Sequence, residues 1–140
     1  IERAKPGFIA VGPDGRRFVN EADSYHDFIS ALLAVYPGGI PPHAWIIADN
    51  RAQRRFGLGW AKPFPFPLRP YNNCGYLRSS RTISGLAKRI GVPSRALEET
   101  VNAFNAGAAR GEDPNSGVAN LPTTAFRATA PTRPTLLCAR

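Results

Sequence analysis

The sequence predicts an α+β fold in which a small sheet, begun by an N-terminal hairpin, packs against three or four helices. Two strand-like segments flank a turn near the N-terminus. Several later segments place apolar residues three and four positions apart, which is the spacing of one helical face. The chain has 140 residues, 43% of them hydrophobic, which suits a single globular domain.

The N-terminal hairpin is the first predicted element. Residues 8–11 and 17–19 are strand-like, and the Gly-Pro-Asp-Gly sequence between them favours a turn. A helix is predicted next, because Ser24 can cap its first turn and Asp27 follows three residues later. A Pro-Gly-Gly sequence after Tyr36 should end this helix. The residues expected on its buried face are Phe28, Leu32 and Val35.

The middle of the chain is predicted to hold a buried strand, a short helix and an extended segment. Residues 44–48 are mostly apolar, and Asp49 or Asn50 can cap a helix that runs through Phe56. Residues 61–70 contain four prolines, which lack a backbone donor and favour an extended chain. The aromatic side chains near this segment could line an apolar substrate entrance, but we expect most of them in the core: Phe64, Phe66, Tyr71 and Tyr76.

Two more helices are predicted to form a helical hairpin. Thr82 begins the first and Gly91 ends it, and the second runs from about Pro93 to about Gly107. The apolar face of the first comprises Ile83, Leu86, Ala87 and Ile90. The apolar face of the second comprises Leu97, Val101, Phe104 and Ala108.

The net charge of +8 raises the question of a nucleic-acid partner. Basic residues are scattered apart from Arg51, Arg54 and Arg55, and no nucleic-acid-binding motif is present, so we expect a mixed solvated surface and no nucleic-acid partner. A basic binding module without catalysis is the alternative. No apolar run reaches the ~18 residues of a membrane span. Cys74 and Cys138 form no disulfide or metal-binding pattern, which favours a reducing cytoplasm and predicts no metal site.

Two segments resemble a known family. Residues 15–21, GRRFVNE, resemble the G-x-R-F-x-N-E segment of the fumarate reductase / 3-ketosteroid 1-dehydrogenase flavoprotein superfamily, where this segment opens the domain that caps the flavin. Residues 86–105 resemble the L-A-x-R-I-G-V-x-x-x-x-L-x-x-T-V-x-x-F-N run of the same cap domain. The resemblance covers nearly all of residues 5–114 and implies FAD as the cofactor of the parent enzyme.

The resemblance also implies a catalytic residue. Four positions after Glu21, fumarate reductases typically place a proton-donating arginine and ketosteroid dehydrogenases a tyrosine, and this chain has Tyr25. Tyr25 is thereby implied to remove a proton next to the carbonyl of a small apolar ketone, while flavin N5 takes hydride. Free phenols titrate near pH ~10, so the role requires positive charge or a tyrosine relay nearby. The alternatives are a half-buried packing role for Tyr25 and a fumarate or succinate substrate. His26 could assist in proton transfer but ranks below Tyr25.

Residues 1–114 are interpreted as the capping, or substrate, domain. Gly57-Leu58-Gly59-Trp60 lacks the third glycine of a dinucleotide fingerprint and has no βαβ context, so it is predicted to be a loop. We therefore expect the FAD domain to be missing from this chain, which alone should bind FAD weakly or not at all and lack turnover. Methionine is absent even at position 1, which favours an excerpt from a longer protein.

Residues 115–140 depart from the resemblance. The family typically continues with E-F-G-R-G and a Tyr-Asn-Arg segment, whereas this chain reads NSGVAN after Pro114. Synonymous codons for the tail, read one base earlier, can spell E-F-G-R-G-E-S-A-Y-N-R, so we interpret the tail as off-frame after a one-base deletion. A divergent terminus is the alternative. In both cases we predict disorder or loose extended structure from about residue 115.

Overall fold

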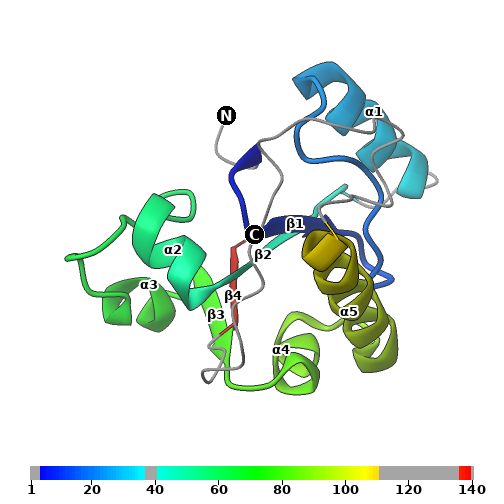
Figure 1. The fold of residues 1–140 in the computed structure, drawn as a ribbon. Helices are drawn as coiled ribbons and strands as arrows, with labels where there is room; N and C mark the ends of the chain where they lie inside the picture. The colour runs from blue at the N-terminus through cyan, green and yellow to red at the C-terminus, as the bar shows by residue number, and fades with distance from the viewer. Residues whose placement is uncertain (1–3, 37–40, 111–135, 140) are drawn as a thin grey trace.

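A four-stranded antiparallel sheet with the strand order β1-β2-β4-β3 lies at the centre of the fold (Figure 1). The computed structural model describes residues 4–36, 41–110 and 136–139. The strands are β1 (Phe8–Val11), β2 (Trp45–Asp49), β3 (Leu77–Ser80) and β4 (Leu136–Ala139). The helices are α1 (Tyr25–Val35), α2 (Asn50–Phe56), α3 (Arg69–Asn73), α4 (Ile83–Ile90) and α5 (Ser94–Arg110). The predicted α+β class is confirmed.

Helices cover both faces of the sheet. All four residues of β1 are buried, because successive side chains along a strand point to opposite faces and each face is covered. Ile9 and Val11 pack with Ile47 of β2 in the core cluster that includes α4 and α5. Phe8 packs on the side of α2, and Ala10 packs with the buried residues of α1. Figure 1 shows α2 and α3 on one side of the strands and α4 and α5 on the other.

The predicted helix caps are present. Ser24 caps α1, Asp49 caps α2 and Thr82 caps α4, each with a side-chain oxygen that accepts the backbone N–H three residues later. Gly91 ends α4 with a φ of 77°, a left-handed conformation that glycine adopts without the steric cost of a Cβ. These ends were predictable because capping depends on neighbours in the sequence.

The N-terminal hairpin is shorter than predicted. Val11 and Arg17 form a single isolated bridge, and residues 17–19 are not a strand. The ladder partner of β1 is instead β2, with Ile9 opposite Ile47. Beyond this bridge the Arg17 side chain pairs with Glu21, which belongs to the segment that leads to α1.

The segment before α3 also differs from the prediction. Phe66 donates its N–H to the carbonyl of Pro63 at 3.1 Å, so residues 61–70 turn instead of running extended. The short helix α3 was not predicted and raises the number of helices among the described residues to five. Pro70 is tolerated there because the first N–H groups of a helix have no intrahelical partner.

Two of the four aromatic residues expected in the core lie on the surface. Phe64 and Phe66 are exposed, whereas Tyr71 and Tyr76 pack against the core cluster that contains Leu77. The two phenylalanines alternate with prolines in a loop, so no strand or helix directs them inward.

Residues 136–139 belong to the tail that was predicted to be disordered or loosely extended, and they form a strand. Leu136–Ala139 forms β4, with Cys138 opposite Ile47 of β2 and Arg78 of β3. The backbone groups of β2 and β3 that face each other need hydrogen-bond partners, and β4 supplies them. Residues 111–135, on which the rest of the predicted tail and the frameshift depend, lie outside the described residues.

Candidate functional site

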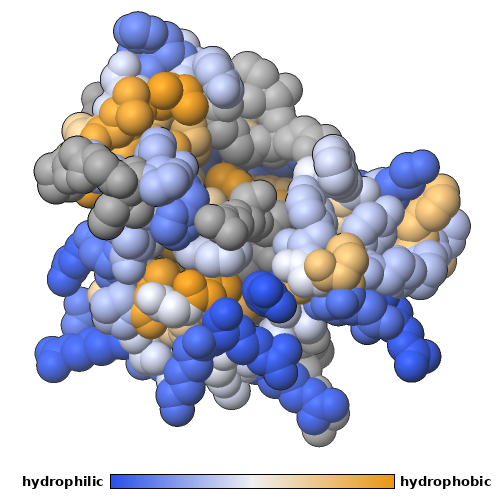
Figure 2. Space-filling view, turned by 180° about the vertical axis from the view of Figure 1, so that it is seen from behind, coloured by the Kyte–Doolittle hydropathy of each residue, from blue (hydrophilic) through white to orange (hydrophobic). Residues whose placement is uncertain are grey.

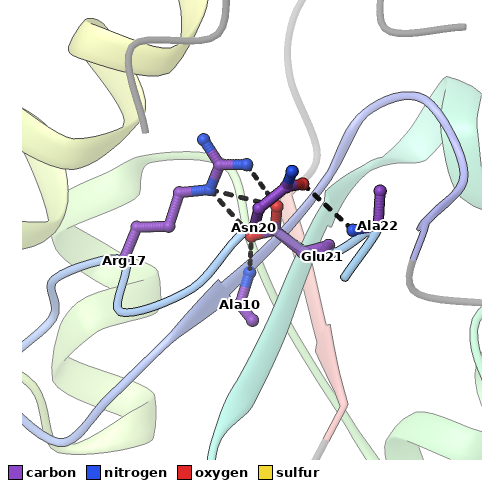
Figure 3. Close-up of polar contacts among 5 residues, drawn as sticks. All are labelled: Ala10, Arg17, Asn20, Glu21 and Ala22. Atoms are coloured by element: carbon purple, nitrogen blue, oxygen red, sulfur yellow. Dashed lines mark hydrogen bonds and ion pairs between the residues drawn. The ribbon is translucent and has the colours of Figure 1, made fainter. Parts of the chain in front are cut away.

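A buried ion pair holds the segment that leads into α1. Nε of Arg17 donates to both carboxylate oxygens of Glu21, at 2.9 and 3.0 Å, and Nη2 contacts Oε2. The two side chains retain only 6% and 5% of their exposure. Oε1 of Glu21 also accepts the backbone N–H of Ala10 in β1 at 2.6 Å (Figure 3). The pair therefore ties the approach to α1 to a strand at the edge of the sheet.

Two further contacts fix the same segment. The Arg17 guanidinium lies 5.5 Å from the ring centroid of Phe104 in α5, within the range of a cation–π interaction. Oδ1 of Asn20 accepts the N–H of Ala22 at 3.0 Å, and its backbone carbonyl accepts the N–H of Asp23 at 3.0 Å. Arg17, Asn20 and Glu21 thus have a structural role, because their contacts fix the segment that leads into α1.

Tyr25 is the first residue of α1 and is 69% exposed. Ser24 stabilises this helix start, since its Oγ accepts the N–H of Asp27 at 3.2 Å and donates to Asp27 Oδ2 at 2.7 Å. The first turn of a helix carries partial positive charge, which favours an anion there. This exposure excludes the half-buried packing role for Tyr25 in this chain, and the Ser24 cap holds its backbone at the helix start.

The other predicted site residue is not brought into one cluster with Tyr25. His26 is the second residue of α1 and is exposed. Adjacent residues on a helix do not face each other, so His26 and Tyr25 project in different directions. The hydrogen bond from the Ala10 N–H to the Glu21 carboxylate was not predicted from the sequence. Its donor is a backbone group on an edge strand, and a backbone donor has no signature in the order of side chains.

A parallel βαβ unit with a glycine-rich turn, which cradles the phosphates in Rossmann-type dinucleotide sites, does not occur among the described residues. Every strand pair among these residues is antiparallel. Gly57 and Gly59 instead belong to a loop closed by a bridge between Leu58 and Ala61. The described part of the chain also contains no group of three side chains that could hold a metal ion. None of its helices has the length and apolar character needed to cross a membrane.

Comparison with known proteins identifies similar flavoenzymes. The chain is 43% identical over 122 residues to 4-oxocyclohex-2-ene-1-carboxylate 5-dehydrogenase of Sinomonas cyclohexanicum, covering 87% of this chain and 21% of the relative. It is similar to the crystal structure of 3-ketosteroid delta1-dehydrogenase from Sterolibacterium denitrificans in complex with 1,4-androstadiene-3,17-dione. The TM-score is 0.76 at 26% identity, covering 99% of this chain and 27% of that one. The open conformation of a flavocytochrome c3 fumarate reductase gives a TM-score of 0.68 at 27% identity. This match covers 95% of this chain and 20% of the reductase chain.

These comparisons confirm the resemblance stated from the sequence. The chain spans 21% of the length of the curated relative, so it corresponds to only part of such an enzyme. FAD is the cofactor of the parent family. Because residues 1–137 match the family described as FAD binding domain, the chain belongs to that family of flavoproteins, with ketosteroid dehydrogenases and fumarate reductases among its structural neighbours.

Proposed function

We propose that this chain is the capping segment of an FAD-dependent dehydrogenase that acts on a cyclic ketone. The observation that carries the proposal is the exposed side chain of Tyr25 at a firmly held helix start. The names of two similar proteins, an oxocyclohexene-carboxylate dehydrogenase and a ketosteroid dehydrogenase, describe the oxidation of cyclic ketones.

In this proposal Tyr25 accepts a proton from the carbon next to the substrate carbonyl. The buried pair of Arg17 and Glu21 ties the segment before α1 to β1, which supports a fixed position for the start of the helix that carries Tyr25. A flavin bound in the parent enzyme supplies the electron-accepting chemistry. We infer that its phosphates are held by sequence outside this segment, because every strand pair among the described residues is antiparallel. The isolated chain should therefore bind FAD weakly or not at all and show no turnover.

A fumarate-reducing enzyme is the second candidate, favoured by the similarity to a flavocytochrome c3 fumarate reductase. The resemblance of residues 15–21 implies an arginine four positions after Glu21 in such enzymes, and this chain has Tyr25 there. A phenol cannot reproduce the permanent positive charge of a guanidinium beside a dicarboxylate. We therefore rank ketone dehydrogenation first.

The test uses the full-length parent enzyme, prepared with FAD and an artificial electron acceptor. Three compounds are compared: 4-oxocyclohex-2-ene-1-carboxylate, a 3-ketosteroid, and fumarate in the presence of a reduced dye. We expect one of the ketones to be dehydrogenated and fumarate to be left unreduced. Rapid fumarate reduction without dehydrogenation of either ketone would contradict the proposal.

A further inference from the structure

The positive charge of this protein is concentrated in one stretch of the chain. Residues 50–97 contain no Asp or Glu, although the whole chain has 10 of them. All the Lys and Arg side chains of this stretch are exposed: Arg51, Arg54, Arg55, Lys62, Arg69, Arg78, Arg81, Lys88, Arg89 and Arg95. They carry more positive charge than the net +8 of the entire chain. The stretch therefore carries exposed positive charge without any acidic residue of its own.

Three large aromatic side chains are exposed within the same stretch. Trp60, Phe64 and Phe66 are 81%, 63% and 51% exposed and lie in residues 60–66 between α2 and α3, here named the aromatic loop. Cations lie against two of the rings, with Arg54 Cζ 4.5 Å from the Phe64 centroid and Lys62 Nζ 4.9 Å from that of Phe66. On the side of the molecule where α2 and α3 lie, Figure 2 shows hydrophobic and strongly hydrophilic side chains next to each other.

The outward position of the rings is fixed by contacts of the loop. Trp60 stacks on Tyr76 with ring centroids 5.8 Å apart and an angle of 16° between the planes. The backbone N–H of Trp60 donates to the Tyr76 hydroxyl at 3.0 Å. The N–H of Phe64 donates to the carbonyl of Arg54 in α2 at 2.9 Å. The intervening prolines restrict the backbone further. The exposure of these rings is thus a feature of the folded chain and does not result from a loosely attached segment.

We propose that the aromatic loop and its surrounding cations dock on the surface of an anionic phospholipid bilayer. Aromatic rings are favoured at the boundary between acyl chains and headgroups, and Lys and Arg close to that boundary bind anionic headgroups. The absence of acidic residues from this stretch removes the charges that anionic lipid would repel. The protein would lie on the bilayer, with the rings of Trp60, Phe64 and Phe66 in the interface.

Two other occupants fit less well. A second copy of this chain would bring one basic surface against another, which like-charge repulsion opposes. Single-stranded nucleic acid binds by stacking bases on open aromatic faces. Here Tyr76 stacks on one face of the Trp60 ring, and one cation lies against each of the Phe64 and Phe66 rings, which leaves fewer open faces for bases.

The experiment measures binding of the 140-residue chain to sedimented vesicles at moderate salt. Neutral vesicles of phosphatidylcholine are compared with vesicles that also contain phosphatidylglycerol, and a single-stranded oligonucleotide is titrated separately. We expect binding to the anionic vesicles only, weakened by added salt. Brominated acyl chains should quench the fluorescence of Trp60, and the Trp60→Phe variant should bind while losing most of that quenching.

Variants separate the contribution of the rings from that of the charges. The triple variant Trp60→Ser/Phe64→Ser/Phe66→Ser should lower vesicle affinity at least about tenfold, because three apolar groups no longer enter the interface. Lys62→Gln should lower it about fivefold. The matched controls lie outside the basic stretch: Leu33→Ser, at a 54% exposed position of α1, and Arg16→Gln, with a 66% exposed side chain.

The proposal is overturned by any of three results: equal binding to neutral and anionic vesicles, unchanged affinity of a triple variant with a native circular dichroism spectrum, or tighter binding to the oligonucleotide than to the vesicles. If the triple variant does not fold, the vesicle affinity of Lys62→Gln is compared with that of Arg16→Gln to test the proposal. Equal losses of vesicle affinity in these two variants would refute a specific docking surface at the aromatic loop.

Discussion

At the scale of single residues, the candidate site depends most on the buried contact between Arg17 and Glu21. Burying two charges is costly unless each finds its partners. Here the Glu21 carboxylate receives hydrogen bonds from Arg17 and from the backbone of Ala10, and the guanidinium also lies against Phe104. The motif that resembles the flavoprotein cap therefore has a structural reason, because it joins the approach to α1 to the sheet.

Removing the carboxylate of Glu21 should destabilise the fold strongly. Glu21→Ala removes the buried carboxylate that accepts from the Arg17 guanidinium and from the Ala10 N–H. We expect a loss of about 3–5 kcal/mol in the free energy of unfolding, measured by urea denaturation. Glu99→Ala is the control, since Glu99 pairs with Arg95 at 3.0 Å on the surface and should cost less than about 1 kcal/mol. Equal losses for the two variants would show that the buried pair has no special role.

At the scale of elements, the helix limits were predictable because capping and periodicity are local. Ser24, Asp49 and Thr82 cap helices as expected, and the periodic faces of α4 and α5 are buried in one cluster. The sheet was not predictable to the same degree. β1 pairs with β2, about forty residues away, and not with the adjacent segment at 17–19. Strand pairing over such a distance depends on packing that no short pattern encodes.

The helix that carries Tyr25 should weaken when its cap is removed. Ser24→Ala deletes the acceptor of the Asp27 N–H, and we expect a loss of about 1 kcal/mol in the free energy of unfolding. Ser30→Ala changes an exposed serine inside the same helix and should be neutral or slightly stabilising, because alanine favours helix. Thermal or urea unfolding of both variants gives the comparison. A cap that contributes nothing would make the two curves coincide.

The strand β4 makes the C-terminus part of the sheet. A chain that ends at residue 135 would lose the partner of both β2 and β3. We expect faster amide hydrogen exchange at β2 and β3 in this shortened chain, because their facing backbone groups become open to solvent. The N–H groups of β1 serve as an internal reference. If exchange at β2 and β3 is the same in both chains, the C-terminus does not pair in solution and the expectation of a disordered tail is restored.

At the scale of the whole molecule, the two proposed surfaces are separate. Tyr25 begins α1, whereas the aromatic loop joins α2 and α3, and Figure 1 shows α1 apart from these two helices. A bilayer bound at the aromatic loop would therefore leave the start of α1 accessible. The resemblance of two motifs predicted the family and its cofactor. It did not predict the exposed rings of Phe64 and Phe66, since exposure depends on which elements cover a loop.

The central claim is that Tyr25 accepts the substrate proton, and it is tested most directly by kcat/KM of the full-length enzyme with its ketone. Tyr25→Phe keeps the ring and removes only the hydroxyl, so we expect kcat/KM to fall by ~10²–10⁴, the usual contribution of a general base. His26→Gln, at the neighbouring exposed position, should change it by less than about threefold. A Tyr25→Phe enzyme that keeps kcat/KM within about threefold of the unmodified enzyme would contradict the account.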